Sequence, residues 1–321
     1  MKVHPLYSSS DGNACRVYNN NNSILIDCGV SKRKLFSNGV FPIDAIFVTH
    51  EHSDHANGIG VIGRATGASI YIHKGIHKKL KYRYALDSCN IKYISKGKQI
   101  LIGDLKVTPY PTSHDVQYSF YYIVEEKLTN SKYCHITDTG TFLPKMYANI
   151  QKSDALLLEM NYDENKLDRF DGYTKFHKNR IKSDVGHLGI QQTIDFIKIN
   201  LDLNKFQWIG VGHISPRTND YKIVHKRLRS NFPDYKHFYC FPGNTYLNII
   251  NPNEFDIDKS NRNENYKYKK CFRNMRVRAM RESNSWEIPA KKYITLYNRA
   301  IRQGAKKKRK KKVVPSVQQK Q

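Results

Sequence analysis

The most constraining feature of this chain is the run His50-Glu51-His52-Ser53-Asp54-His55, which directly follows a short apolar stretch. That stretch, Ala45–Val48, has the continuous hydrophobicity of a strand buried on both faces. The run has the pattern HxHxDH, and imidazole and carboxylate ligands suit Zn²⁺, Mn²⁺ or Fe²⁺. The first two histidines can face one ion while the aspartate and the last histidine face a second. Only 13 histidines occur in 321 residues, so a chance cluster in a surface loop is the weaker interpretation.

Two ions need more ligands than one motif supplies. The other candidates share one position, just after a predicted strand: His114 after Val107–Pro111, Asp138 after Tyr133–Thr137, and His213 after Trp208–Val211. Binding sites form readily where chains leave a sheet. Two metals held about 3.5–4 Å apart can activate a water for phosphoryl transfer. The sequence therefore predicts a dinuclear hydrolytic site.

The rest of the first 250 residues alternates short β-type stretches with loops and contains one clear amphipathic helix, expected near Gly189–Asn200. A polar, Gly-containing loop is expected at Ser8–Asn13. The remaining strands are predicted at Val3–Tyr7, Cys15–Tyr18, Ser23–Cys28, Ser69–Ile72, Leu105–Thr108, Tyr118–Val124 and Ala155–Glu159. No internal repeat of solenoid period is present.

Charge divides the chain near Pro252. The net charge of the whole chain is +26, and residues 255–321 hold 21 Lys and Arg against 5 Asp and Glu. We therefore expect a domain at 1–252 and a basic, largely flexible extension at 253–321. Such an excess of cations favours a polyanionic partner.

The six cysteines lie far apart without a CxxC pair, which argues for free thiols rather than a disulfide framework or a zinc ribbon. Nothing near Met1 has the pattern of a signal peptide, and no apolar run approaches the roughly 20 residues that cross a bilayer. We expect an intracellular, cytoplasmic protein that does not enter a membrane.

The order HxHxDH, His, Asp, His, each at a strand end, resembles that of the metallo-β-lactamase superfamily. The resemblance covers roughly residues 1–250 and is most similar to the YycJ/WalJ-type branch, whose members are described as DNA exonucleases acting from the 5′ end. The resemblance is not confined to the candidate ligands. It extends to the segments Leu25–Gly29, Phe47–His55, Pro111–Asp115 and Ser183–Leu188. The resemblance implies an α/β fold, a four-layer αβ/βα sandwich, here with the basic C-terminal extension.

The resemblance also implies a role for each candidate ligand. One divalent metal ion would be bound by His50, His52 and His114, and the other by Asp54, His55 and His213, with Asp138 bridging the two. The metals would be zinc or manganese, with iron as a third candidate. A hydroxide or water between them would be the nucleophile, and Asp54 would also act on that water.

His187 precedes the predicted helix and lies between the bridging aspartate and the last metal histidine. In related nucleases a histidine in this position contacts the scissile phosphate, and it could protonate the leaving oxygen; the alternative is a capping or surface histidine. Ser183 and Asp184 could cap the helix, whose N-terminus would itself favour a phosphate. Asp27 is a candidate support for a ligand histidine, and Glu159 a candidate partner of His187.

The extension interleaves cations with aromatic residues and ends in an unbroken cationic run. Three interpretations remain open: retention of nucleic acid, a solvated tail that aids solubility, or a targeting signal if the host has a nucleus. We rank them in that order. The residues of the run are Lys306, Lys307, Lys308, Arg309, Lys310, Lys311 and Lys312.

Four functions are compatible with the sequence. The first is a metal-dependent phosphodiesterase that trims DNA from a 5′ end, with DNA a better candidate partner than RNA. The second is an RNA-processing endonuclease, and the third a small-molecule metallohydrolase. The fourth is a nucleic-acid-binding protein whose metal site is structural, which the full ligand set argues against.

Overall fold

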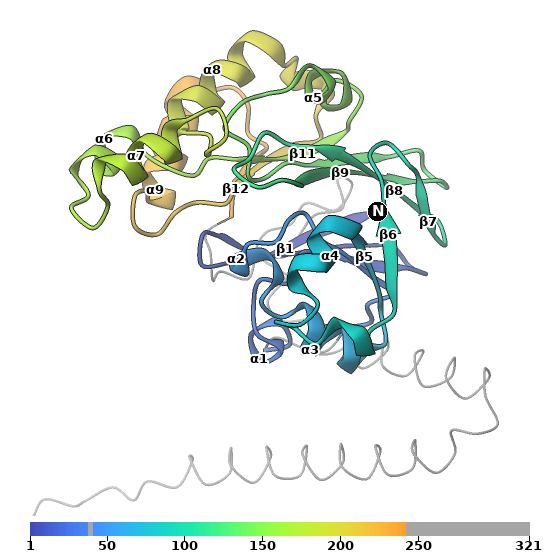
Figure 1. Ribbon diagram of the computed structural model, residues 1–321. Helices are drawn as coiled ribbons and strands as arrows, with labels where there is room; N and C mark the ends of the chain where they lie inside the picture. The colour runs from blue at the N-terminus through green and yellow to red at the C-terminus, as the bar shows by residue number, and fades with distance from the viewer. Residues whose placement is uncertain (38–40, 242–321) are drawn as a thin grey trace, which may run out of the picture. The chain divides into compact units, whose positions relative to one another are not determined.

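Two β-sheets form the centre of the fold in the computed structural model, which describes residues 1–37 and 41–241. Figure 1 shows helices α5 (Pro144–Ile150) and α8 (Ile190–Asn200) on the outer side of one sheet, and α3 (Ile59–Thr66) and α4 (Lys74–Leu80) on the outer side of the other. This layering is the α/β sandwich expected from the sequence. The predicted extension at 253–321, with Lys306–Lys312, lies outside the described residues.

The first sheet has six strands in the order β1-β2-β3-β4-β5-β6. Its first two pairs are antiparallel and the others parallel. The strands are β1 Lys2–Ser9, β2 Gly12–Tyr18, β3 Ser23–Ile26, β4 Ala45–Phe47, β5 Ser69–His73 and β6 Ile91–Ile94.

The second sheet has seven strands in the order β13-β12-β11-β10-β9-β8-β7. The pairs from β13 to β10 are parallel and those from β10 to β7 antiparallel. The strands are β7 Ile100–Ile102, β8 Leu105–Pro111, β9 Phe120–Glu126, β10 Lys132–His135, β11 Ala155–Glu159, β12 Trp208–Gly212 and β13 Phe238–Cys240.

The other helices are α1 Lys32–Leu35, α2 Ser53–Ala56, α6 Glu164–Arg169, α7 Lys175–Lys182 and α9 Tyr221–Asn231, and the short 3-10 turns are Leu86–Ser88 and Leu203–Lys205. No helix in the described part of the chain has both the length and the apolarity to span a membrane.

The core lies on both faces of the second sheet, and β11 shows how. Leu157 packs with residues of the first sheet, whereas Leu156 and Leu158 pack beneath the helices of the other side. Because both faces are covered, the strand is apolar throughout rather than alternating. Its last residue, Glu159, is fully buried although it is charged.

The predicted strands all form, and β11 has the predicted bounds, whereas the ends of the others are shifted. The loop expected at Ser8–Asn13 is shorter, because Ser9 pairs with Gly12 and leaves a two-residue turn. Strands β6, β7 and β13 were not predicted. Each is three or four residues long at the edge of a sheet and only partly buried, so none carries a strong hydrophobic period.

Candidate metal centre

The HxHxDH motif leaves the first sheet after β4 and runs into the short helix α2. His52 occupies the N-cap position of α2, while Asp54 lies in its first turn. His50 and His55 are fully buried, whereas the side chain of His52 is 35% exposed. Of the four candidate ligands in the motif, His50 and His55 therefore lie beneath the surface, while His52 and Asp54 are partly exposed.

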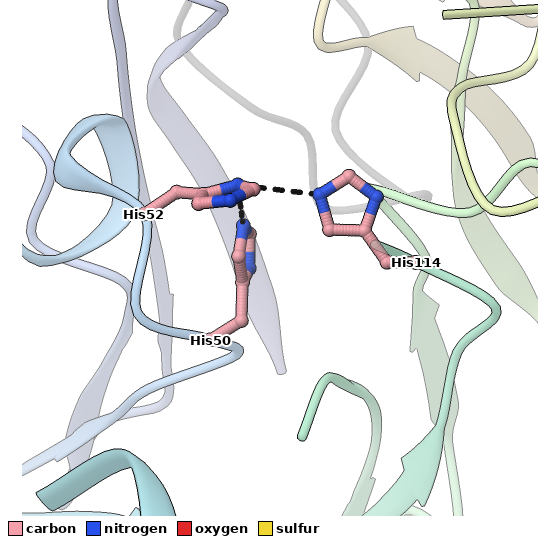
Figure 2. A group of neighbouring side chains, drawn as sticks. All are labelled: His50, His52 and His114. Carbon is pink, nitrogen blue, oxygen red and sulfur yellow. Dashed lines mark hydrogen bonds between the residues drawn. The ribbon is translucent and has the colours of Figure 1, made fainter. Parts of the chain in front are cut away.

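Three histidines converge in a first cluster, which Figure 2 shows. His52 Nδ1 lies 3.0 Å from His50 Nε2 and 3.3 Å from His114 Nε2. His114 comes from the loop between β8 and β9, in the other sheet. One nitrogen from each ring is within 4.8 Å of the others, so the three could hold one ion.

A second cluster is formed by Asp54, His55 and His213. Asp54 Oδ2 lies 3.3 Å from His55 Nε2 and 3.4 Å from His213 Nε2. His213 follows β12, as predicted. Its backbone has a positive φ of 52°, which costs energy in a non-glycine residue and is typical of functional sites.

Asp138 lies between the two clusters. Its Oδ2 is 3.1 Å from His55 Nε2, and its Oδ1 is 3.5 Å from His213 Nε2 and 3.8 Å from His114 Nε2. Oδ2 is buried but accepts no hydrogen bond from the described residues. A buried carboxylate oxygen without a donor is costly, and a bound cation would satisfy it.

The buried histidines of the two clusters are oriented so that one ring nitrogen of each is left for a metal. Four of them place Nδ1 against a protein oxygen: His50 against Thr49 Oγ1 (2.9 Å), His55 against Asp27 Oδ2 (2.7 Å), His114 against the carbonyl of Gly186 (3.1 Å) and His213 against Glu159 Oε1 (2.8 Å). In a neutral imidazole, such partners favour the tautomer that is protonated at Nδ1, in which Nε2 can bind a metal. The residues present therefore fit divalent metal ions.

Asp27, the predicted support of a ligand histidine, contacts His55 and the residue that precedes the HxHxDH motif. Its carboxylate accepts hydrogen bonds from the backbone and hydroxyl of Thr49, both at 2.8 Å, in addition to contacting His55. It is buried and has a φ of 61°. These contacts link the strand end to the second cluster.

Asp27→Asn is expected to weaken metal binding about 10- to 100-fold. An asparagine tolerates the positive φ but supplies only one acceptor oxygen, so its amide group would face a donor at Thr49 or Nδ1 of His55. Competition against a chromophoric chelator would measure the change. Asp195→Asn, an exposed acid that accepts from Gln191 on α8, is the control. Unchanged affinity in Asp27→Asn would show that this carboxylate does not orient His55.

Glu159, at the end of β11, supports two histidines at once. Its Oε1 lies 2.6 Å from His187 Nδ1 and 2.8 Å from His213 Nδ1, while Oε2 accepts from the backbone of Thr139 at 3.0 Å. The pairing with His187 was a candidate in the sequence, but the contact with His213 was not foreseen. His187 lies 3.7 Å from Asp138 Oδ1 and lines the cavity at the site.

The carboxylates control the charge of the site. Burial holds the pKa of His50 well below its usual range. Burial also acts to lower the pKa of His213, but Asp138, Asp54 and Glu159 outweigh it and raise that pKa to about 10. For His187, burial is likewise outweighed by Glu159, so its pKa is raised. The carboxylates thus make the second cluster an environment that favours cations.

The proposed capping of α8 by Ser183 and Asp184 is wrong. The helix begins at Ile190 with Gly189 as its N-cap, and Ser183 instead ends α7. Residues 188 and 189 stay extended because they pair with the segment after β11. The amide of Gln191 in the first turn of α8 donates to Glu164, so a carboxylate already occupies the position suggested for a phosphate.

A cavity of about 310 Å³ opens over the two clusters. Besides the candidate ligands and His187, it is lined by residues to which the sequence assigned no role in the site: Ser10, Asp115, Tyr173, Arg180, Ile181 and Arg217. Asp115 lies 3.4 Å from His114 Nε2 and is paired with Arg180. Asp115 ends the segment Pro111–Asp115, which carries part of the family resemblance, but the sequence assigned it no role.

Residues 22–199 match the family model described as the beta-lactamase superfamily domain. The chain belongs to the metallo-β-lactamase superfamily. The exodeoxyribonuclease WalJ of Streptococcus pneumoniae is 30% identical over 238 residues, which cover 71% of this chain and 87% of that protein. The exodeoxyribonuclease YycJ of Bacillus anthracis is 32% identical over 190 residues, covering 57% and 71%.

Two further relatives define how far the likeness extends. A ribonuclease Z of Methanothermobacter thermautotrophicus is 34% identical over 120 residues, but these cover only 32% of this chain and 38% of that enzyme. The crystal structure of Zn²⁺-bound PqqB from Methylobacterium extorquens superposes with a TM-score of 0.59 at 15% identity, covering 78% of this chain and all of that one. The latter likeness supports the fold alone. As a member of the WalJ/YycJ-like branch of the superfamily, the protein is a metal-dependent hydrolase.

Proposed function

We propose that this protein is an exonuclease that hydrolyses DNA from the 5′ end at a centre of two divalent ions, zinc or manganese. One ion would be bound by His50, His52 and His114, the other by Asp54, His55 and His213. The observation that carries the proposal is the position of Asp138, whose carboxylate contacts histidines of both clusters. One carboxylate between two ligand groups is the arrangement of a bridged pair.

When bound, two such ions supply Lewis-acid stabilisation of a phosphate and an activated water. The remaining chemistry belongs to side chains of this chain. Asp54 accepts a hydrogen bond from Asn13 Nδ2 at 3.3 Å, which holds its carboxylate where it can orient the attacking water. His187 is held by Glu159, whose carboxylate raises the pKa of the imidazole, and it would donate a proton to the leaving oxygen.

DNA is the substrate favoured by the relatives, because both exodeoxyribonucleases match across most of their length. The net charge of +26 suits a polyanion. We further propose that Lys306–Lys312, outside the described residues, retain the substrate without sequence preference. The domain boundary near residue 252 is part of the same proposal.

The second candidate is an RNA-processing endonuclease, favoured by the shorter match to ribonuclease Z. Purified protein supplied with Mn²⁺ or Zn²⁺ and offered 5′-labelled, 3′-labelled and end-blocked DNA and RNA distinguishes the two. We expect early release of the 5′ label from free-ended DNA and loss of activity with a chelator. Cleavage of end-blocked substrates would favour the endonuclease, and activity that survives chelation would contradict both.

A further inference from the structure

Helix α7, Lys175–Lys182, has an unusual composition for a helix on a folded domain. None of its residues is buried, whereas surface helices normally bury an apolar stripe. Four of its eight residues are Lys or Arg and none is acidic. Phe176 is 75% exposed. Its own packing therefore does not explain why this helix carries an aromatic residue.

The helix is nevertheless anchored beside the metal centre. Thr174 caps its first turn, and Lys178 donates to the carbonyl of Asp168 at 2.7 Å. At its other end Arg180 pairs with Asp115, the neighbour of His114, and the carbonyl of Ile181 accepts from the backbone of His187 at 2.9 Å. The position of α7 is thus tied to a ligand loop and to His187.

Aromatic rings gather at the start of α7. Phe170 and Tyr173 pack edge to face with centroids 4.8 Å apart, and His177 lies 6.2 Å from Tyr173 and 6.1 Å from Phe176. Tyr173 also lines the cavity over the metal clusters. The rings therefore lead from the exposed Phe176 toward the site.

We propose that α7 and the turn before it form a docking surface for single-stranded DNA, the strand that enters the metal centre. This proposal rests on the proposed function. Unpaired bases stack on Phe176 and Tyr173, and Arg180 and Lys175 neutralise the neighbouring phosphates. Rings interleaved with cations are the general means of holding a single strand, and Arg180 has donors left beyond those that Asp115 occupies. Bases inside a duplex would not reach these rings.

The test measures binding to full-length, metal-loaded protein, using a fluorescent phosphorothioate oligonucleotide of about 12 nucleotides that resists hydrolysis. Fluorescence anisotropy at about 0.2 M salt limits the contribution of non-specific charge. We expect Phe176→Ala to raise the Kd for the single strand about tenfold, and Phe176→Tyr to restore it. Leu128→Ala, which removes another apolar side chain that is 73% exposed, is the matched control.

The Kd for a blunt duplex of the same length is measured as a comparison. The duplex carries phosphate charge but no unpaired bases, so it separates the contribution of stacking from that of charge. An unchanged Kd for the single strand in Phe176→Ala, or an equal loss for the duplex, would overturn the proposal. Photocrosslinking of iododeoxyuridine oligonucleotides gives an independent readout. Crosslinks are expected in the segment that contains Tyr173 and Phe176. Crosslinks confined to other segments would also overturn the proposal. Because binding is measured without hydrolysis, failure of the proposed nuclease activity would remain distinguishable.

Discussion

Asp138→Asn is expected to lower the rate of DNA hydrolysis by more than about a thousandfold, because metal ions contribute several kcal/mol of transition-state stabilisation. Asp138 is the residue whose carboxylate contacts histidines of both clusters, at 3.1 to 3.8 Å. An amide has the same shape but no charge to share between two cations. Asparagine also tolerates the φ of 55° at this position, so the backbone need not change.

Metal content by mass spectrometry and activity on 5′-labelled DNA should fall together in Asp138→Asn. Asp234→Asn, an exposed acid between α9 and β13, is the control for the loss of one negative charge. Circular dichroism should give native-like spectra for both variants. Full metal content with full activity in Asp138→Asn would contradict a bridging role.

His187→Ala is expected to slow hydrolysis of DNA by about 10²- to 10⁴-fold, the usual contribution of a general acid. A nitrophenyl ester of a nucleotide has a leaving group that needs no proton, so its hydrolysis should fall less than about tenfold. The difference between the two substrates separates proton donation from a purely structural role. His225→Ala, on the exposed side of α9, is the control.

Glu159→Gln tests the same proton donation by His187, because it changes the residue that contacts His187. Because Glu159 Oε1 contacts both His187 and His213, this variant should lose activity on the nitrophenyl ester as well as on DNA. Combined with His187→Ala, its effect on DNA should be less than the sum of the two changes, since residues that act as a unit are not additive. Equal losses of His187→Ala on both substrates would contradict the general-acid role.

Much of the candidate site could be predicted because its signals are local. The spacing of the HxHxDH run is enough to identify four candidate metal ligands. The strand before the run is apolar enough to be recognised. His114, Asp138 and His213 could be proposed because each polar residue ends a predicted strand. The edge strands β6, β7 and β13 lacked such a signal, since partial burial leaves little hydrophobic period.

The supporting contacts could not be predicted, because they join segments far apart in the chain. Gly186 accepts from His114 across 72 positions, and the hydroxyl of Ser8 accepts from the backbone of His213 across 205. No spacing in the sequence encodes either pairing. The same holds for Arg180, whose place at the cavity depends on Asp115 and on the path of α7.

The sequence by itself determined that this protein is a metal-dependent hydrolase, since the types and spacing of its candidate metal ligands follow from residues at strand ends. Tertiary structure decided how those ligands are used. It directs one ring nitrogen of each buried candidate ligand histidine toward a protein oxygen and leaves the other free to bind a metal. It also brings Glu159 beneath both His187 and His213, and it sets the cations and rings of α7 beside the cavity. These outcomes depend on packing between two sheets, which no local pattern specifies.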